Sequence, residues 1–208
     1  MTAALVTAVL LAAPPAADRS VAESVVRRIE ERHAGAGDLT ARFVQVYRSG
    51  LLGREVTERG TVSIKRPGRM RWDYRDPEAK TFVSDGRTFF FYVPADRQVV
   101  VRTQDGERSI PSLLLSGKGD ILGQFAAELQ TPPGEGLLRV RLTPRKPEPE
   151  IETVTVDVEP SGRIRQIQVD DGQGNRSRFR FDQIRENVGL SDKIFRFEVP
   201  PGVEVIQG

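Results

Sequence analysis

The sequence predicts a mainly β protein, built as one curved antiparallel sheet of about eleven strands with about three α-helices. Apolar and polar residues alternate along most of the chain after residue 38, which is the period of a half-buried strand. Turn signals such as Asp85-Gly86 and Pro160-Ser161-Gly162 separate these stretches. Helical spacing is confined to a few short segments, so helices are the minor component.

Composition excludes several classes of site. The 208 residues include 31 Lys and Arg against 29 Asp and Glu, a net charge of +2 that does not imply nucleic acid binding. There is no cysteine, which excludes a disulfide framework, a thiolate metal site, a cysteine nucleophile and a lipid-modified cysteine. The length fits one large β domain.

The first seventeen residues predict a secretory signal peptide. They carry no charged side chain, and their apolar stretch over residues 3–13 is too short to span a membrane. Ala16 and Ala17 before Asp18 suit cleavage. We therefore expect an exported protein whose single domain covers residues 18–208.

Three segments predict helices. Ser20-Val21-Ala22-Glu23 fits a capping box, followed by an apolar stripe of Val21, Val25 and Ile29 up to Gly35. A short helix is expected over residues 112–115, stopped by Gly117. A third is expected over residues 121–129, capped by Asp120, with Ile121, Phe125 and Leu129 four residues apart.

The strands follow from alternation and turn signals. The densest signal lies between residues 60 and 94, where Val62 and Ile64 share one parity and Met70, Trp72 and Tyr74 share another. Strands are expected over residues 39–47, 55–66, 70–74, 81–84, 88–93, 97–102, 137–143, 152–159, 163–170, 176–184 and 203–206.

One face of this sheet is apolar, and the sequence has few helices to cover it. If the sheet curls and the helices lie over its open side, the interior can hold an apolar ligand such as an acyl chain, at roughly 0.8 kcal/mol per buried methylene. A closed barrel filled by its own side chains fits the same pattern.

Catalysis and metal binding find little support. His33 is the only histidine, and its place at a helix end beside glycine predicts a solvated side chain. Asp170-Asp171-Gly172-Gln173-Gly174-Asn175 lacks the spaced acidic ligands of a calcium loop and predicts a plain turn. We expect no catalytic residue, no metal and no cofactor.

Four motifs resemble the LolA family of periplasmic outer-membrane lipoprotein carriers. They are Phe43 within LTARFVQ, residues 60–74 with Lys65-Arg66-Pro67 and Trp72, Val83-Ser84-Asp85-Gly86 with the aromatic run after it, and the ending FRFEVPPGV. The resemblance implies an incomplete, half-open antiparallel barrel lidded by helices, as in the LolA and LolB proteins. It also implies a monomer located in the periplasm.

The same resemblance implies the partners and the site residues. The cargo is the lipid moiety of acylated lipoproteins, taken from an inner-membrane lipoprotein-releasing ABC transporter and passed to an outer-membrane receptor. Arg66, which ends an apolar row, would latch the lid by bonding backbone carbonyls near residues 25–29 and 113–115. The expected acyl-chain cavity comprises Phe43, Val62, Ile64, Met70, Trp72, Tyr74, Phe89, Phe91, Leu113 and Leu114.

Alternative functions remain open at this point. One is a LolA-like lipid-binding sensor or regulatory domain that acts through a protein partner. A hydrolase is disfavoured because no Ser-His-Asp site exists except through His33. The alternation of Arg176, Arg178 and Arg180 fits the wet face of a strand, or a docking surface for acidic partners or anionic lipid headgroups.

Overall fold

Twelve strands form one open sheet in the computed structural model, which describes residues 16–103, 109–117, 119–134 and 136–208. The strand order is β12-β6-β5-β4-β3-β2-β1-β11-β10-β9-β8-β7, so the two edge strands do not pair and the barrel stays incomplete. Every neighbouring pair is antiparallel except β12 and β6. The predicted mainly β, half-open architecture is confirmed. The expected signal peptide lies almost wholly outside the described residues.

The strand bounds are β1 (Asp38–Arg48), β2 (Glu55–Lys65), β3 (Arg69–Asp76), β4 (Lys80–Ser84), β5 (Thr88–Val93), β6 (Gln98–Thr103), β7 (Phe125–Gln130), β8 (Leu138–Pro144), β9 (Thr153–Val158), β10 (Ile164–Asp170), β11 (Arg176–Glu186) and β12 (Glu204–Gln207).

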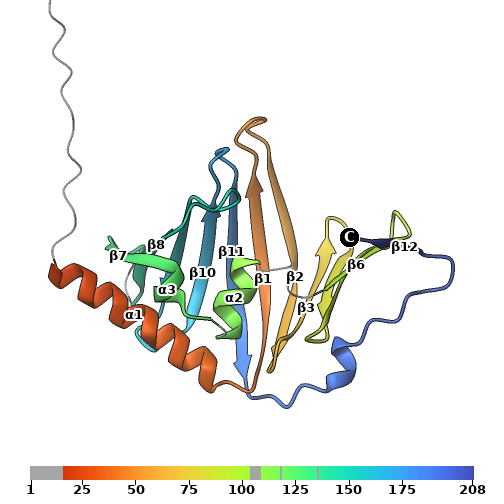
Figure 1. Ribbon diagram of the computed structural model, residues 1–208, viewed down its shortest axis with the longest axis horizontal. Helices are drawn as coiled ribbons and strands as arrows, with labels where there is room; N and C mark the ends of the chain where they lie inside the picture. The colour runs from red at the N-terminus through yellow and green to blue at the C-terminus, as the bar shows by residue number, and fades with distance from the viewer. Residues whose placement is uncertain (1–15, 104–108, 118, 135) are drawn as a thin grey trace, which may run out of the picture.

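Three helices cover one side of the sheet, which we call the inner face: α1 (Ala16–Gly35), α2 (Ile110–Ser116) and α3 (Ile121–Gln124) (Figure 1). The inward parity of the strands is apolar, as in Met70, Trp72 and Tyr74 of β3. Ala22, Val25, Val26 and Ile29 of α1 pack against this face and are buried with it. The core therefore lies between the helices and the concave side of the sheet.

The predicted start of the first helix is wrong. Helix α1 begins at Ala16, so Ser20 lies inside the helix rather than at its N-cap. Val21, expected in the apolar stripe, is 45% exposed, and Ala22 and Val26 take the buried positions beside Val25. Relative to the prediction, the helix is rotated so that Ala22, Val25, Val26 and Ile29 face the sheet.

The third helix is shorter than predicted, because the segment after Gln124 is strand β7. Phe125, Ala127 and Leu129 are two residues apart, as in a strand, whereas Phe125 and Leu129 are also four apart, as in a helix. Both periods therefore fit this segment. Pairing with β8 decides the outcome, and Phe125 and Ala127 are buried inward from a strand. This strand accounts for the twelfth member of the sheet.

The opposite side, the outer face, is covered over half its width by the segment after β11. Residues 187–203, which we call the outer strap, include a 3-10 helix, η2 (Asp192–Phe195), and run across β2 to β6. Phe195 is fully buried, and Phe197 packs against the rings of Phe90 and Tyr92 at 5.3 and 5.4 Å. The outer face of β7 to β11 carries no such strap within the described residues.

A glycine allows the tightest packing in the core. Gly60 of β2 lies opposite Phe43 of β1 on one side and Tyr74 of β3 on the other. A Cβ at Gly60 would collide with the Asp73 carbonyl and lie 2.8 Å from the Phe43 ring. Phe43 is consequently free to lie over β2 with 2% of its surface exposed.

We predict that Gly60→Ala destabilises the protein by about 2 kcal/mol or more, because backbone and ring must both shift. Urea unfolding of the variant would measure the change. Gly172→Ala is the matched control, since a Cβ there has no heavy atom within 4 Å and no positive φ. Equal stability of Gly60→Ala and Gly172→Ala would contradict the packing argument.

Candidate functional site

An apolar cavity of about 110 Å³ lies between the inner face of the sheet and α2. Its walls come from β3, β4, β5 and β11 on the sheet side and from the start of α2 on the other. The lining residues are Met70, Trp72, Tyr74, Phe82, Phe89, Ser109, Pro111, Ser112 and Phe179. Five of the nine are aromatic, so the site presents flat apolar surfaces with few polar atoms.

Four of the ten residues expected from the sequence line this cavity: Met70, Trp72, Tyr74 and Phe89. Sequence reasoning missed Phe82 and Phe179 as lining residues. Alternation in the sequence places Phe179 on the apolar side of its strand, so this residue could have been predicted. Phe82 lies opposite Trp72 across the β3–β4 pair.

The other six expected residues lie close by but do not line the cavity. Phe43, Val62 and Ile64 are buried, with Phe43 in edge contact with the rings of Trp72 and Tyr74 at 5.1 and 4.8 Å. Phe91 stacks on Phe82 at 4.4 Å. The remaining two, Leu113 and Leu114, pack in the core, while α2 turns Pro111 and Ser112 toward the cavity.

The polar groups around the cavity bond one another. Trp72 Nε1 donates to Ser112 Oγ at 3.2 Å, and Ser109 Oγ donates to the same oxygen at 2.7 Å. Tyr74 Oη donates to Gln45 Oε1 at 2.6 Å. Burial, reinforced by the Glu58 carboxylate, raises the pKa of Tyr74 above its usual range, so this hydroxyl stays a neutral donor.

Arg66 lies at the corner after β2 and reaches the end of α2. Its Nη2 is 3.2 Å from the backbone oxygens of both Ser116 and Gly117, two carbonyls that the helix leaves without an intrahelical partner. The expected contact with residues 25–29 of α1 is not present. Gly117 has φ +59, and a Cβ there would lie within 2.8 Å of Arg66 Nη2, so only glycine fits this junction easily.

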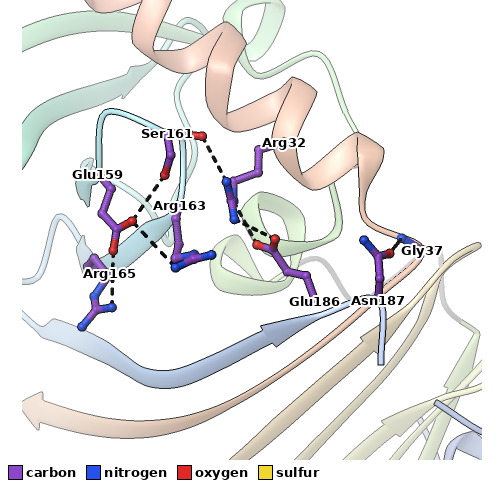
Figure 2. Close-up of polar contacts among 8 residues, drawn as sticks. All are labelled: Arg32, Gly37, Glu159, Ser161, Arg163, Arg165, Glu186 and Asn187. Atoms are coloured by element: carbon purple, nitrogen blue, oxygen red, sulfur yellow. Dashed lines mark hydrogen bonds and ion pairs between the residues drawn. The ribbon is translucent and has the colours of Figure 1, made fainter. Parts of the chain in front are cut away.

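Helix α1 is fixed to the sheet by a polar clamp at its C-terminal end (Figure 2). Arg32 binds Glu186 of β11 through Nε and Nη2 at 2.9 and 2.7 Å and donates to the Ser161 carbonyl at 3.4 Å. Gly37 N donates to Asn187 Oδ1 at 2.8 Å. The helix therefore cannot leave the sheet without breaking a bidentate ion pair of partly buried groups.

The prediction that His33 is solvated is wrong. The side chain is 3% exposed and lies between α1 and Leu115 of α2, because it continues the buried stripe four residues beyond Ile29. Within the described residues, neither ring nitrogen has a hydrogen-bond partner. Burial lowers the pKa of His33 to about 4, with the charges of Arg32 and Arg66 adding to the effect and Glu186 opposing it.

Across the described ranges, no group of three or more His, Asp or Glu residues is placed to hold a metal ion. No helix in the same ranges is both long and apolar enough to cross a bilayer.

A half-open antiparallel barrel that keeps an apolar cavity under a helix defines a class of proteins able to enclose an apolar ligand. The model of the family described as "Outer membrane lipoprotein carrier protein LolA" matches residues 34–198. The chain therefore belongs to the LolA family, as its sequence motifs predicted.

Curated relatives agree with this assignment. Outer-membrane lipoprotein carrier proteins from Pseudomonas paraeruginosa and Azotobacter vinelandii are 33% and 32% identical to this chain. The first alignment covers 88% of both chains, and the second covers 98% of this chain and 96% of its relative.

The solved structure of MucB shows the same fold. MucB superposes with a TM-score of 0.50 at 17% identity, over 90% of this chain and 66% of MucB. A LolA superfamily protein from Nitrosomonas europaea gives a TM-score of 0.48 at 12% identity, over 85% of this chain and 97% of the other.

The buried imidazole yields a prediction for pH dependence. Its pKa is about 6.5 in the unfolded chain and about 4 in the fold, so the unfolded state binds the proton first as pH falls. The free energy of unfolding therefore falls as the pH drops from 6.5 to 4, because His33 is protonated in the unfolded chain first. The loss from this one group reaches up to about 3 kcal/mol.

Urea unfolding of the protein and of His33→Leu from pH 7.5 to 4.5 would measure this loss, since carboxylates titrate alike in both proteins. The charged groups around the ring are Arg32, Arg66, Arg163 and Glu186. An unchanged pH slope in the variant would refute the assignment to His33.

Proposed function

We propose that this protein is a periplasmic carrier that shields the acyl chains of lipoproteins on their way from the inner to the outer membrane, without catalysing a reaction. The aromatic cavity beneath α2 is the observation that carries the proposal, because it offers apolar walls where a LolA-family fold is open. The name of the curated relatives, outer-membrane lipoprotein carrier protein, supports the same cargo.

The ligand is held by two sets of residues in this proposal. Met70, Trp72, Tyr74 and Phe89 contact the acyl chains directly, together with Phe82 and Phe179. Phe43, Val62, Ile64 and Phe91 support the aromatic wall from behind, and Leu113 and Leu114 seat α2 on the core.

Helix α2 is the element that moves. A volume of about 110 Å³ is well below the roughly 300–1,000 Å³ of ordinary ligand sites, so an acyl chain cannot enter unless a wall retreats. The clamp at Arg32 holds α1, whereas α2 is only seven residues long and is tied by Arg66 and by Trp72. Release follows when α2 closes again and the Arg66 bonds to its last carbonyls re-form.

The proposed partners are those of the family: a lipoprotein-releasing ABC transporter of the inner membrane and a lipoprotein receptor of the outer membrane. The protein would meet each as a monomer. Family membership supports these partners, and the aromatic cavity supports the lipid they exchange.

A regulatory domain that senses lipid through a protein partner is the second candidate. The likeness to MucB is one of fold, at 17% identity, whereas the relatives at 33% identity carry the name of carriers. The carrier is therefore the better supported of the two.

Native mass spectrometry tests the proposal directly. The protein would be recovered from the periplasm of a bacterium that co-expresses a lipoprotein, with the same lipoprotein lacking its acylated cysteine as control. We expect a one-to-one complex with the acylated form only. A protein that stays empty and also takes up no fluorescent acyl probe would overturn the carrier function.

We predict that Arg66→Leu folds but retains lipoprotein. The variant removes the two charge-assisted bonds that favour the closed form, each worth roughly 1.5–3 kcal/mol, so the open, loaded state gains. The fraction of loaded protein after incubation with acceptor membranes measures the effect. Arg42→Leu is the control, because its ion pair with Asp182 is exposed and far from α2. Equal release by Arg66→Leu and Arg42→Leu would refute the latch.

A further inference from the structure

A basic groove of about 390 Å³ lies on the outer face of β7 to β11, on the half that the outer strap leaves uncovered. It is separate from the cavity, which lies on the inner face. Its lining is polar throughout and includes no carboxylate: Gln130, Arg139, Arg141, Thr155, Gln166, Gln168, Arg178 and Arg180. We propose that this groove binds an extended acidic peptide segment of a partner protein.

The four arginines of the groove form a rectangle that the sheet register defines. Arg139 and Arg141 lie on β8, and Arg178 and Arg180 lie on β11. Arginines two residues apart on one strand are roughly 7 Å apart, and three strand spacings separate the two pairs by roughly 14 Å. An extended peptide has the same repeat of roughly 7 Å between alternate side chains, so its acidic residues can match the arginines of one strand.

Two rows of side chains cross the strands and differ at one position. In the first row, Asp157 of β9 lies opposite Arg139 and accepts hydrogen bonds from its Nε and Nη2 at 2.6 and 2.8 Å. In the second row, Thr155 occupies the equivalent place opposite Arg141. The second row therefore lacks the carboxylate that neutralises the first.

Asp157 shows that this surface can hold a carboxylate tightly. Asp157 is 4% exposed and also accepts a hydrogen bond from Gln166 Nε2 at 2.9 Å, so donors of the sheet face surround its carboxylate. The neighbouring row offers the guanidinium groups of Arg141 and Arg178 around Thr155, while the Gln168 amide already donates to Asp170 at 2.8 Å. A carboxylate supplied from outside can be bound above Thr155 by guanidinium groups in the same bidentate way.

Two of the guanidinium groups are available for such a ligand. Within the described residues, neither Arg141 nor Arg180 makes a hydrogen bond or an ion pair, and Arg178 donates only to Gln168 Oε1, at 3.3 Å. Glu128 lies opposite Arg141 on the edge strand but does not line the groove. Arg139 is already neutralised by Asp157, and therefore serves to fix the wall rather than to bind.

The other half of the same face shows what kind of occupant fits. There the outer strap, a segment of the chain itself, lays its 3-10 helix η2 over outward-facing cations. Its Asp192 pairs with Lys65 at 2.7 Å and Arg69 at 3.6 Å, and Arg71 donates to the Ile194 carbonyl at 2.9 Å. The strap thus shows that outward-facing cations of this sheet bind a polypeptide segment through a carboxylate and a backbone carbonyl, and the charge of the groove favours a segment with acidic side chains.

A binding measurement with defined peptides tests the inference on the full chain. The probe is a fluorescein-labelled eight-residue peptide of alternating Glu and Thr, with a Gln and Thr peptide of the same length as control. We expect saturable binding of the Glu peptide in about 50 mM salt that weakens as salt increases, because screening acts on exposed charges. No saturable binding, or equal binding of the Gln peptide, would overturn the inference.

Matched variants locate the site. Arg141→Gln with Arg180→Gln removes two unpaired groove arginines, and Arg75→Gln with Arg87→Gln removes the same charge from exposed positions on the other half of the sheet. We expect the groove variant to bind the Glu peptide about tenfold or more weakly and the control variant to bind within about twofold of the parent. Thermal melts verify that both variants fold.

Two further results would overturn the assignment. Equal weakening in both variants would mean that binding follows net charge and not the groove. Groove-dependent binding to vesicles containing phosphatidylglycerol, without binding to the peptide, would mean that the face contacts lipid headgroups instead of a protein.

Discussion

An open sheet with one apolar face imposes the constraint on which this molecule depends: that face must be covered, and the chain has little with which to cover it. The described helices are α1 with 20 residues, α2 with seven and α3 with four. They lie over part of the concave side of the twelve-stranded sheet, and the cover is thin where α2 meets β3 and β5. The cavity lies at that place, because a seven-residue helix cannot fill the space over so many aromatic side chains.

The polar contacts divide this cover into a fixed part and a movable part. Around the end of α1, Arg32 makes two charged hydrogen bonds to Glu186 at 2.9 and 2.7 Å, and Gly37 N donates to Asn187 Oδ1 at 2.8 Å. Around α2, the contacts include the 3.2 Å bonds from Arg66 and the 3.2 Å bond from Trp72. His33 of α1 is buried against Leu115 of α2, whose backbone opposes the lowering of the imidazole pKa by burial. This difference in anchoring supports the proposal that α2, and not α1, moves when the cavity opens.

The fold was largely predictable, because alternation with a period of two residues predicts which side chains of a strand face inward. Met70, Trp72 and Tyr74 follow from alternation alone, and so does the apolar parity of β11. The same rule fails for Phe125 to Gln130, where a short run fits two periods and only pairing with β8 decides. Alternation also does not predict whether an inward side chain lines the cavity or lies behind its wall. Phe43 and Trp72 have the same orientation, yet the first supports the wall and the second lines the cavity.

The candidate site was less predictable than the fold, because helix rotation and distant contacts set it. Leu113 and Leu114 of α2 pack in the core, which leaves Pro111 and Ser112 facing the cavity. His33 was expected in solvent because a helix end beside glycine is usually wet, but the stripe of Val25, Val26 and Ile29 continues through it to α2. Arg66 was anticipated as a latch through family resemblance, and its partners lie one residue or two beyond the expected segment of α2.

The balance of energies at α2 explains how a carrier of this design can release its load. In the proposed mechanism, the two charge-assisted bonds from Arg66 favour the closed form by about 3–6 kcal/mol, which equals the burial of roughly four to eight methylene groups. A longer acyl chain gains more than this, but it must also separate Leu114 and Leu115, both buried, from the core. Opening therefore offsets part of what the lipid gains. A lipid bound against such an opposing term stays shielded from water and still leaves when an acceptor offers a modestly better environment.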